Sequence, residues 1–243
     1  MMADFRCLSG KALVALSATA LFTAPALAGP DWDEGGTDAG STIGTAQVIN
    51  LNGTLNTITG KLTGTALLAG DFQDCFLIEI SDPLVFSIST SPGFGGPAGF
   101  DPMMFLFRVD NLNGQLVAKA MMANNDKSPG NPQAGLQRET NDGSQTVISQ
   151  AGLYMIAISG FGSQPINAQG EFIFNQAFLQ PGVFAGPTQG QVSDYLLAGW
   201  NTDGSAGTYT MTVQGISGTQ LPTPGATALL VLGGLAARRR RQR

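Results

Sequence analysis

The sequence predicts an all-β fold, arranged as an antiparallel sandwich or barrel, for the central part of the chain. Three observations support this prediction. Short β-prone runs alternate with clusters of Gly, Asn, Asp and Pro. No sustained helical period occurs between residues 47 and 217. The 33 Gly and 13 Pro residues show no Gly-x-y repeat, so they indicate turns and not a collagen or a linker.

Ten short runs are predicted to form strands. Alternation of side chains is clearest in Phe72–Ile80 and Val85–Ile88. A series of short strands with turn signals between them is typical of sandwiches and barrels. The predicted strands are Gln47–Leu51, Thr54–Leu62, Phe72–Ile80, Leu84–Thr90, Met103–Val109, Leu116–Met121, Gln145–Ser149, Leu153–Ser159, Glu171–Phe174 and Gly207–Gln214.

The connections between these runs carry turn residues. Asn111–Gly114 lies between two apolar runs and predicts a β-hairpin. Asn141–Gly143 and Asp203–Ser205 precede strands in the same way, because Asn and Gly tolerate the left-handed backbone that such turns need.

The stretch Gly160–Gly190 is longer and richer in Pro than the other connections. We interpret it as an insertion that packs over an edge or one end of the sandwich. Its aromatic residues suggest two alternatives. They either form an exposed binding surface, or Phe172, Phe174 and Phe178 cover core strands.

The N-terminal residues 1–28 predict a secretory signal helix. Arg6 and Lys11 lie at the start of the apolar run Ala12–Phe22, and Ala26-Leu27-Ala28 follows the small-x-small cleavage rule. We therefore expect signal peptidase to cleave after Ala28. The alternative is an N-terminal membrane anchor, for which the apolar run is short.

The C-terminal residues 218–243 have three parts. Pro222-Thr223-Pro224-Gly225 is followed by the 12-residue apolar run Ala226–Ala237 and by five arginines near the end. A transmembrane helix needs roughly 20 apolar residues, and arginines stay on the cytoplasmic side. The sequence thus predicts a short hydrophobic helix that holds the protein in the membrane only transiently.

This tail resembles the bacterial PEP-CTERM sorting signals, in which a Pro-Glu-Pro motif precedes a short hydrophobic helix and an Arg-rich end. Thr223 stands at the position of the usual Glu. The resemblance implies an exosortase-type transpeptidase as a partner and cleavage near Pro222–Gly225. A plain C-terminal tail anchor without processing is the alternative.

The body between the two ends is strongly acidic. It keeps five of the 12 basic residues and 16 of the 17 acidic residues, which gives a net charge of about −11. Such a surface repels nucleic acid and anionic lipid headgroups and attracts cations. We therefore expect no nucleic acid partner.

The composition also limits catalysis. The chain has no histidine, which excludes Ser-His-Asp and Cys-His arrangements and His-based zinc sites. Cys75 is the single cysteine of the body and is predicted to be a small buried residue on one face of a strand. A glycosidase needs only two carboxylates, but no spacing indicates a pair. The sequence predicts a protein that is not an enzyme.

Oxygen-rich segments are the remaining candidates for a site. Residues 29–46 form an acidic arm without periodicity, predicted to be a loop, and further carboxylates lie in turns beside Asn124 and Asn125. Calcium takes six to eight oxygen ligands in a tolerant geometry. Calcium is thus a possible but not a required cofactor, and solvated turn residues are the alternative. The candidate ligands are Asp31, Asp33, Glu34, Asp38, Asp101 and Asp126.

Several segments of the body resemble the bacterial pre-peptidase C-terminal domain. Cys75 stands where an aromatic residue is usual. The resemblance implies a jelly-roll-like β-sandwich and a non-catalytic accessory module of exported proteins, some of which bind calcium or polymer. The matching segments are Gly70–Phe76, Phe100–Pro102, Met104–Phe107, Asn113-Gly114, Asn124–Asp126, Gly152–Gly160 and Gly207–Val213.

Together these observations predict one β-sandwich domain over residues 47–217, exported to the cell envelope or the extracellular space. The favoured function is that of a structural or adhesive surface protein. The alternative is a module that binds carbohydrate, such as extracellular polysaccharide, or another polymer through exposed aromatic residues. The candidate aromatic residues are Trp32, Phe94, Phe161 and Trp200.

Overall fold

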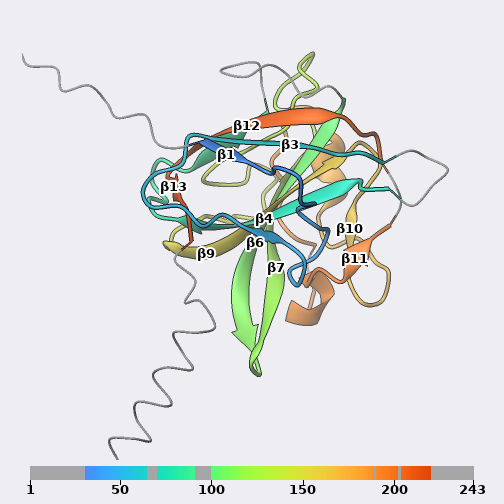
Figure 1. Cartoon of the computed structure of the whole chain (residues 1–243). Coiled ribbons are helices and arrows are strands. Elements are labelled where there is room, and N and C mark those ends of the chain that lie inside the picture. The colour runs from blue at the N-terminus through green and yellow to red at the C-terminus, as the bar shows by residue number, and fades with distance from the viewer. Residues whose placement is uncertain (1–30, 65–69, 91–99, 189, 202–203, 220–243) are drawn as a thin grey trace, which may run out of the picture.

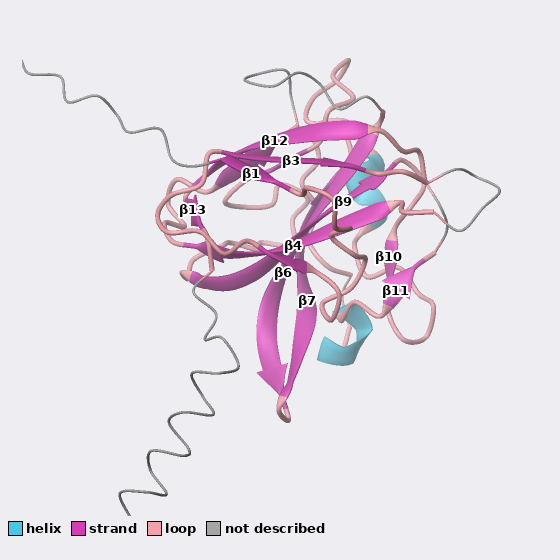
Figure 2. Cartoon of the chain, in the orientation of Figure 1, coloured by secondary structure: helices cyan, strands magenta, loops and turns pink. Residues whose placement is uncertain are grey.

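The computed structural model describes residues 31–64, 70–90, 100–188, 190–201 and 204–219. The predicted signal helix and the C-terminal hydrophobic helix lie outside these residues. Strands dominate the described part, and its helical segments are the 3₁₀ helices η1 (Gln176–Leu179) and η2 (Val192–Tyr195) (Figure 2). The predicted all-β class is confirmed.

The strands form two main sheets (Figure 1). The first sheet has the order β1 (Asp31–Asp33), β3 (Thr57–Lys61), β12 (Thr208–Gln214), β5 (Ser87–Ser89) and β8 (Gly135–Leu136). The second has the order β13 (Ile216–Ser217), β4 (Gln73–Ile80), β9 (Gly152–Gly160), β6 (Pro102–Leu112) and β7 (Gln115–Asn124), with β2 (Gln47–Val48) paired to β4. A small two-stranded sheet joins β10 (Pro165–Ile166) to β11 (Gly199–Trp200).

The sheets are mixed and not purely antiparallel. Most pairs are antiparallel, but β1 runs parallel to β3 and β2 runs parallel to β4. Both of these parallel pairs involve one of the first two strands of the chain, β1 or β2. The prediction of an antiparallel architecture is therefore corrected at these two edges.

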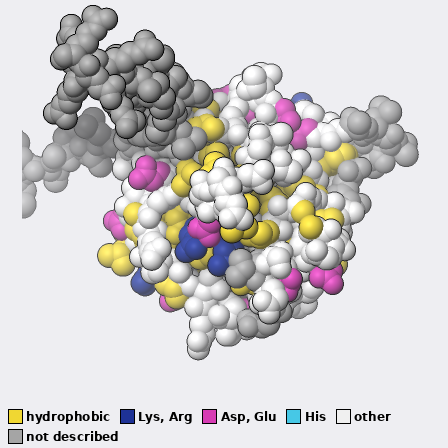
Figure 3. Space-filling view, turned by 90° about the horizontal axis from the view of Figure 1, so that it is seen from below, with side chains coloured by type: hydrophobic (Ala, Val, Ile, Leu, Met, Phe, Trp, Pro, Cys, Tyr) yellow, Lys and Arg dark blue, Asp and Glu magenta, His cyan; other side chains and the backbone are white. Residues whose placement is uncertain are grey.

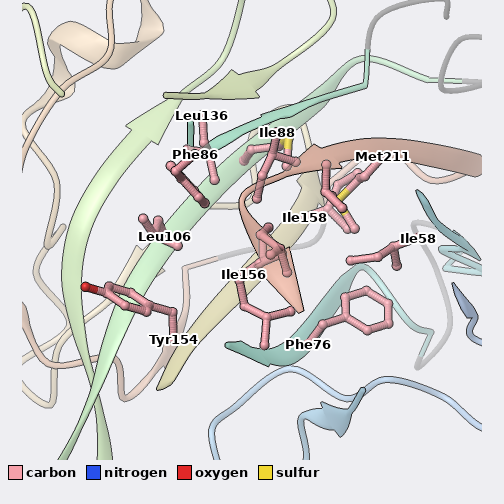
Figure 4. Close-up of a cluster of buried hydrophobic side chains, with 14 of the residues drawn as sticks. Ile58, Phe76, Phe86, Ile88, Leu106, Leu136, Tyr154, Ile156, Ile158 and Met211 are labelled. Carbon is pink, nitrogen blue, oxygen red and sulfur yellow. The ribbon is translucent and has the colours of Figure 1, made fainter. Parts of the chain in front are cut away.

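The two sheets face each other across an inner core (Figure 4). Ile58 and Met211 of the first sheet belong to the same buried cluster as Phe76, Leu106 and Ile156 of the second. Large apolar side chains of both sheets are thus buried against one another. The removal of their surface from water is the main contribution to the stability of such a sandwich.

The second sheet is buried on its other face as well. Phe105 and Phe107 of β6 lie in an outer core with Phe174 and Phe178, and the Phe105 and Phe178 ring centroids are 5.7 Å apart. Cys75 is fully buried in this outer core, as predicted. A sheet that is covered on both faces needs apolar residues at consecutive positions. This requirement explains the continuous apolar runs in β6 and β9.

The outer core decides between the two interpretations of the Gly160–Gly190 stretch. Phe174 and Phe178 are buried against β6 and cover the sheet, whereas Phe172 is 41% exposed. The segment forms only isolated bridges at Phe172 and Phe174, so the predicted strand over residues 171–174 is wrong. The same holds for residues 145–149, where Val147 makes a single bridge.

The hairpin between β6 and β7 confirms the turn predicted at Asn111–Gly114. Asn113 and Gly114 have φ angles of 53° and 88°, and the Gly114 N–H donates to the side chain of Asn111. The hairpin extends away from the sheets (Figure 1). Seen from below, this side carries hydrophobic side chains beside a group of basic ones (Figure 3).

Gly215 joins the two sheets at a sharp corner. It lies between β12 of the first sheet and β13 of the second and has a φ of 71°. Its carbonyl accepts hydrogen bonds from the N–H groups of Ser81 and Asp82. A Cβ at this position would collide with the Asp82 carbonyl, so both the conformation and the space require glycine.

Candidate metal centre between the arm and the sandwich

The acidic arm is attached to the sandwich and is not an irregular loop throughout, which corrects the prediction. Its first residues form β1 on the edge of β3. The Trp32 indole donates a hydrogen bond of 2.7 Å to the Gln47 side chain. At the other end of the arm, the Trp200 indole donates to the Ser41 carbonyl at 2.7 Å. The arm is therefore held by both sheets.

Four carboxylates meet where the arm crosses the entry to β4. Glu34 and Asp38 come from the arm, Asp74 lies at the start of β4, and Asp71 lies two residues before that strand. One oxygen of each side chain lies within 4.8 Å of the oxygens of the others. We call these four residues the acidic cluster.

Asp74 is the innermost member of the acidic cluster. It is fully buried, because its place in β4 puts it on the inner face together with Phe76. Its Oδ2 accepts a hydrogen bond of 2.5 Å from the Tyr209 hydroxyl. Its Oδ1 is buried and has no hydrogen-bond partner among the described residues. An unpaired buried carboxylate oxygen is costly, so binding of a proton or a cation at this atom would be favourable.

Backbone groups hold Glu34 in place. Its Oε1 accepts from the Ala39 N–H at 3.1 Å, and its Oε2 accepts from the Lys61 N–H at 2.9 Å. Gly60 leaves the space for this arrangement, since a Cβ there would collide with the Tyr209 hydroxyl and the Glu34 carboxylate. The local fold thus positions Glu34 before any ligand binds.

The electrostatics of the acidic cluster favour protonation when no cation is bound. Burial, with the added charges of the neighbouring carboxylates, raises the pKa of Asp74 to about 8. Burial and the charges of Asp38 and Glu34 raise the pKa of Asp71 to about 7. Burial likewise raises the pKa of Glu34. Among the described residues the ion pair is Arg108–Asp110 on the β6–β7 hairpin, and no member of the acidic cluster takes part in one.

The donor atoms of the acidic cluster suit a hard cation. All four side chains offer oxygen, whereas zinc prefers nitrogen and sulfur ligands. Cys75 follows Asp74 directly but points to the outer core on the opposite face of the sheet. Calcium accepts carboxylate oxygens in variable number and geometry, and its charge would remove the repulsion among the four groups.

The arrangement differs in part from the predicted ligand set. Asp31 and Asp33 are exposed and accept hydrogen bonds from Thr57 and Thr59 on β3 at 2.7 and 2.8 Å, and neither belongs to the acidic cluster. Side chains alternate along β1, so the arm cannot present every carboxylate to one point. Asp71 and Asp74 were not predicted as partners of the arm. The sequence does contain an indication that Asp74 is buried. It alternates with the residues of β4 that point to the inner core, beginning with Phe76.

Asp101 and Asp126 lie in a separate place, at the ends of β6 and β7. Burial and the charge of Asp126 raise the pKa of Asp101, which indicates that the two carboxylates are close. They do not belong to the acidic cluster. The structure therefore divides the six predicted ligands among three locations.

The candidate aromatic residues for polymer binding differ in their exposure. Trp32 and Trp200 are half-buried, pack against the two cores and use their indole N–H groups internally. Phe161 is 51% exposed. Phe94 lies outside the described residues.

The processing residues Ala28, Pro222, Thr223, Pro224 and Gly225 also lie outside the described part. Within that part, no helix combines the length and the apolar character that crossing a bilayer requires. Comparisons with protein-family models, with curated proteins and with solved structures find no match to this chain.

Proposed function

We propose that this chain is an exported, non-catalytic surface protein with a structural or adhesive function, and that calcium fastens its N-terminal arm to the sandwich. The observation that carries the proposal is the acidic cluster. It joins two residues of the arm to two residues of β4 around the unpaired, buried Oδ1 of Asp74.

Calcium would act by linking segments that are far apart in the sequence. Glu34 and Asp38 repel Asp71 and Asp74 when all four are charged, which weakens the attachment of the arm. A bound cation replaces this repulsion with attraction and supplies a partner for Asp74 Oδ1. Ligands that bind only the folded state stabilise it by mass action, so the arm and the sandwich would be most stable where calcium is abundant.

The acidic cluster is better suited to binding than to catalysis. Raised pKa values also occur in active sites, and two carboxylates suffice for a glycosidase. However, the hollow beside the cluster, of about 350 Å³, is lined by Glu34 and Tyr209 but not by Asp71 or Asp74. A substrate in this hollow would not reach the most perturbed carboxylates.

Export and sorting follow from the two ends of the sequence. The signal peptide predicts export with cleavage by signal peptidase after Ala28. The PEP-CTERM-like tail supports transient membrane attachment through the C-terminal helix, followed by cleavage by an exosortase-type enzyme and retention at the cell envelope or release outside the cell. The resemblance of the body to pre-peptidase C-terminal domains, and their jelly-roll-like sandwich, agrees with an accessory module.

Thermal unfolding of the purified exported protein tests the calcium site. With calcium at 100-fold excess over its dissociation constant, we expect a stabilisation of about 2.7 kcal/mol relative to chelator. Ionic strength must be matched, so that binding is separated from screening. The double variant Glu34→Gln, Asp38→Asn should lose this response.

The arm provides a matched control for this experiment. The double variant Asp31→Asn, Asp33→Asn removes the same charge from exposed positions outside the acidic cluster. It should keep the full response to calcium. Equal unfolding midpoints of the parent protein with calcium and with chelator would rule out the site.

A further inference from the structure

A second hollow has a volume of about 830 Å³. It lies between the turn at Asp142–Gln145 and two segments of the stretch Gly160–Gly190, which covers the outer face of the second sheet. These segments are Asn175–Gln176 and Pro187–Thr188. Its volume falls in the range of about 300–1,000 Å³ that is usual for small-molecule sites. It shares no lining residue with the hollow beside the acidic cluster.

Asp142 links the segments that line this hollow by hydrogen bonds. Its Oδ1 accepts from the Ser144 N–H and hydroxyl, at 3.0 and 2.6 Å. Its Oδ2 accepts from the Asn175 side-chain amide and the Gly186 N–H, both at 3.1 Å. Although partial burial opposes the effect, these hydrogen bonds lower the pKa of Asp142. The carboxylate is thus charged but fully occupied, and it ties three segments together.

Gln145 lines the hollow with an exposed side chain. It has a φ of 56°, a left-handed conformation that is uncommon for a residue other than glycine. Its side chain is exposed, and no hydrogen bond joins it to the described residues. A strained residue held by its surroundings is often found at a binding site. Gln145 lines the hollow, so its exposed amide is available to a ligand that binds there.

The remaining polar groups are neutral and partly free. Gln176 donates its side-chain N–H to the Phe174 carbonyl, which leaves Oε1 as an acceptor. Thr188 donates its hydroxyl to the Ile173 carbonyl and keeps acceptor capacity. The lining contains no Lys or Arg, and apart from the ring of Pro187 it offers almost no apolar side chain.

We propose that this hollow binds a neutral oligosaccharide. A cation would find both oxygens of Asp142 already occupied by donors, and an anion would find no basic side chain. An apolar ligand would meet amides and hydroxyls that it could not pair. Hydroxyl groups of a neutral sugar can both donate to and accept from Gln145, Gln176 and Thr188. The net charge of about −11 disfavours an anionic polysaccharide.

Nuclear magnetic resonance titration of the exported protein tests this proposal, with cellotetraose, maltotetraose and chitotetraose added separately. We expect at least one tetrasaccharide to shift the amide signals of Gly143 and Gln145, with a dissociation constant on the order of 1 mM or lower. If none of the three shifts these signals, the proposal is wrong.

Gln145→Gly separates binding from folding. Glycine adopts positive φ without strain, so this variant should fold at least as well as the parent and yet bind the same sugar roughly fivefold more weakly, as loss of one neutral hydrogen bond predicts. Gln145→Asn keeps an amide and should lose less. Gln115→Ala removes an exposed amide from the β6–β7 hairpin and should bind like the parent. Equal binding by Gln145→Gly would overturn the assignment.

The two variants also distinguish this proposal from the calcium site. The Gln145→Gly variant should keep the calcium-dependent rise in its unfolding midpoint, because it does not touch the acidic cluster. Saccharide binding should in turn persist in the Glu34→Gln, Asp38→Asn variant. Loss of sugar binding in that double variant would contradict a site located at Gln145.

Discussion

At the scale of single residues, Asp74 is a carboxylate that lies among the buried side chains of the core. It is fully buried on the inner face of β4, its Oδ2 is bound by Tyr209, and its Oδ1 has no partner among the described residues. A proton or a metal ion can satisfy this oxygen, and the two compete for it. The pH and the calcium concentration should therefore act on the same few atoms.

The raised pKa values give a prediction with a definite sign. The ordinary pKa of an aspartate is 3.8, whereas in the folded protein the pKa of Asp71 is about 7 and that of Asp74 is about 8. Both carboxylates therefore bind a proton more tightly in the folded state than in the unfolded state. Their stabilising contribution is complete below about pH 4 and is lost as the pH rises through 7 and 8. Without calcium, the thermal unfolding midpoint should therefore decrease as the pH is raised from 5 to 9. The decrease should be roughly 2–4 °C for each kcal/mol of unfolding free energy that is lost.

Calcium should oppose this trend, since it binds the deprotonated carboxylates. Thermal unfolding across this pH range, with chelator and with saturating calcium, measures both behaviours. Asp71→Asn should flatten the decline seen in chelator. A midpoint in chelator that stays constant or rises from pH 5 to pH 8 would contradict the assignment of these two pKa values.

At the scale of the elements, the covering segment between β9 and β12 supplies part of the core. Phe178 is fully buried and packs edge-on against Phe105 of β6. Phe178→Ala should lower the free energy of unfolding by about 3–5 kcal/mol, because it leaves a cavity. Denaturant unfolding measures the loss.

Phe172 is the matched control for this prediction. It lies in the same segment but is 41% exposed. Phe172→Ala should change the free energy of unfolding by about 0.5 kcal/mol or less, as is usual for surface positions. Similar losses for the two variants would mean that the segment does not act as a cover for the sheet.

The elements that sequence reasoning found are those with long apolar runs or turn residues. The residues of β4, β6, β7, β9 and β12 were predicted, as was the hairpin at Asn113-Gly114. The elements that it missed are short. Residues of β1, β8, β10, β11 and β13 form strands of two or three residues, in which no period can develop. Their pairing depends on neighbours that are distant in the sequence.

The candidate site was only half predictable for a similar reason. The arm was recognised by its acidic residues, but its partners, Asp71 and Asp74, lie more than 30 positions further along the chain. Glu34 follows β1 on the edge of the first sheet, whereas Asp74 lies in β4 of the second, so their proximity depends on how the two sheets pack, which the composition of the arm does not indicate. The hollow at Gln145 depends on a left-handed residue that no local motif predicts.

At the scale of the whole molecule, the remaining prediction concerns the tail. If a sorting enzyme acts near Pro222–Gly225, the mature protein from its native host should lack Arg238–Arg243. The intact mass of the exported form measures this directly. A mature species that still ends at Arg243 would reduce the tail to an ordinary membrane anchor, without affecting the proposals for calcium or sugar.

The corner at Gly215 has a mechanical consequence for a protein retained through its C-terminal side. Tension that enters at Ser217 acts first on β13 of the second sheet and then, one residue beyond that strand, on β12 at the middle of the first. The carbonyl of Gly215 also holds the chain that leaves β4. Detachment of β13 from the second sheet would therefore pass the load, after a single residue, to β12 at the middle of the first sheet.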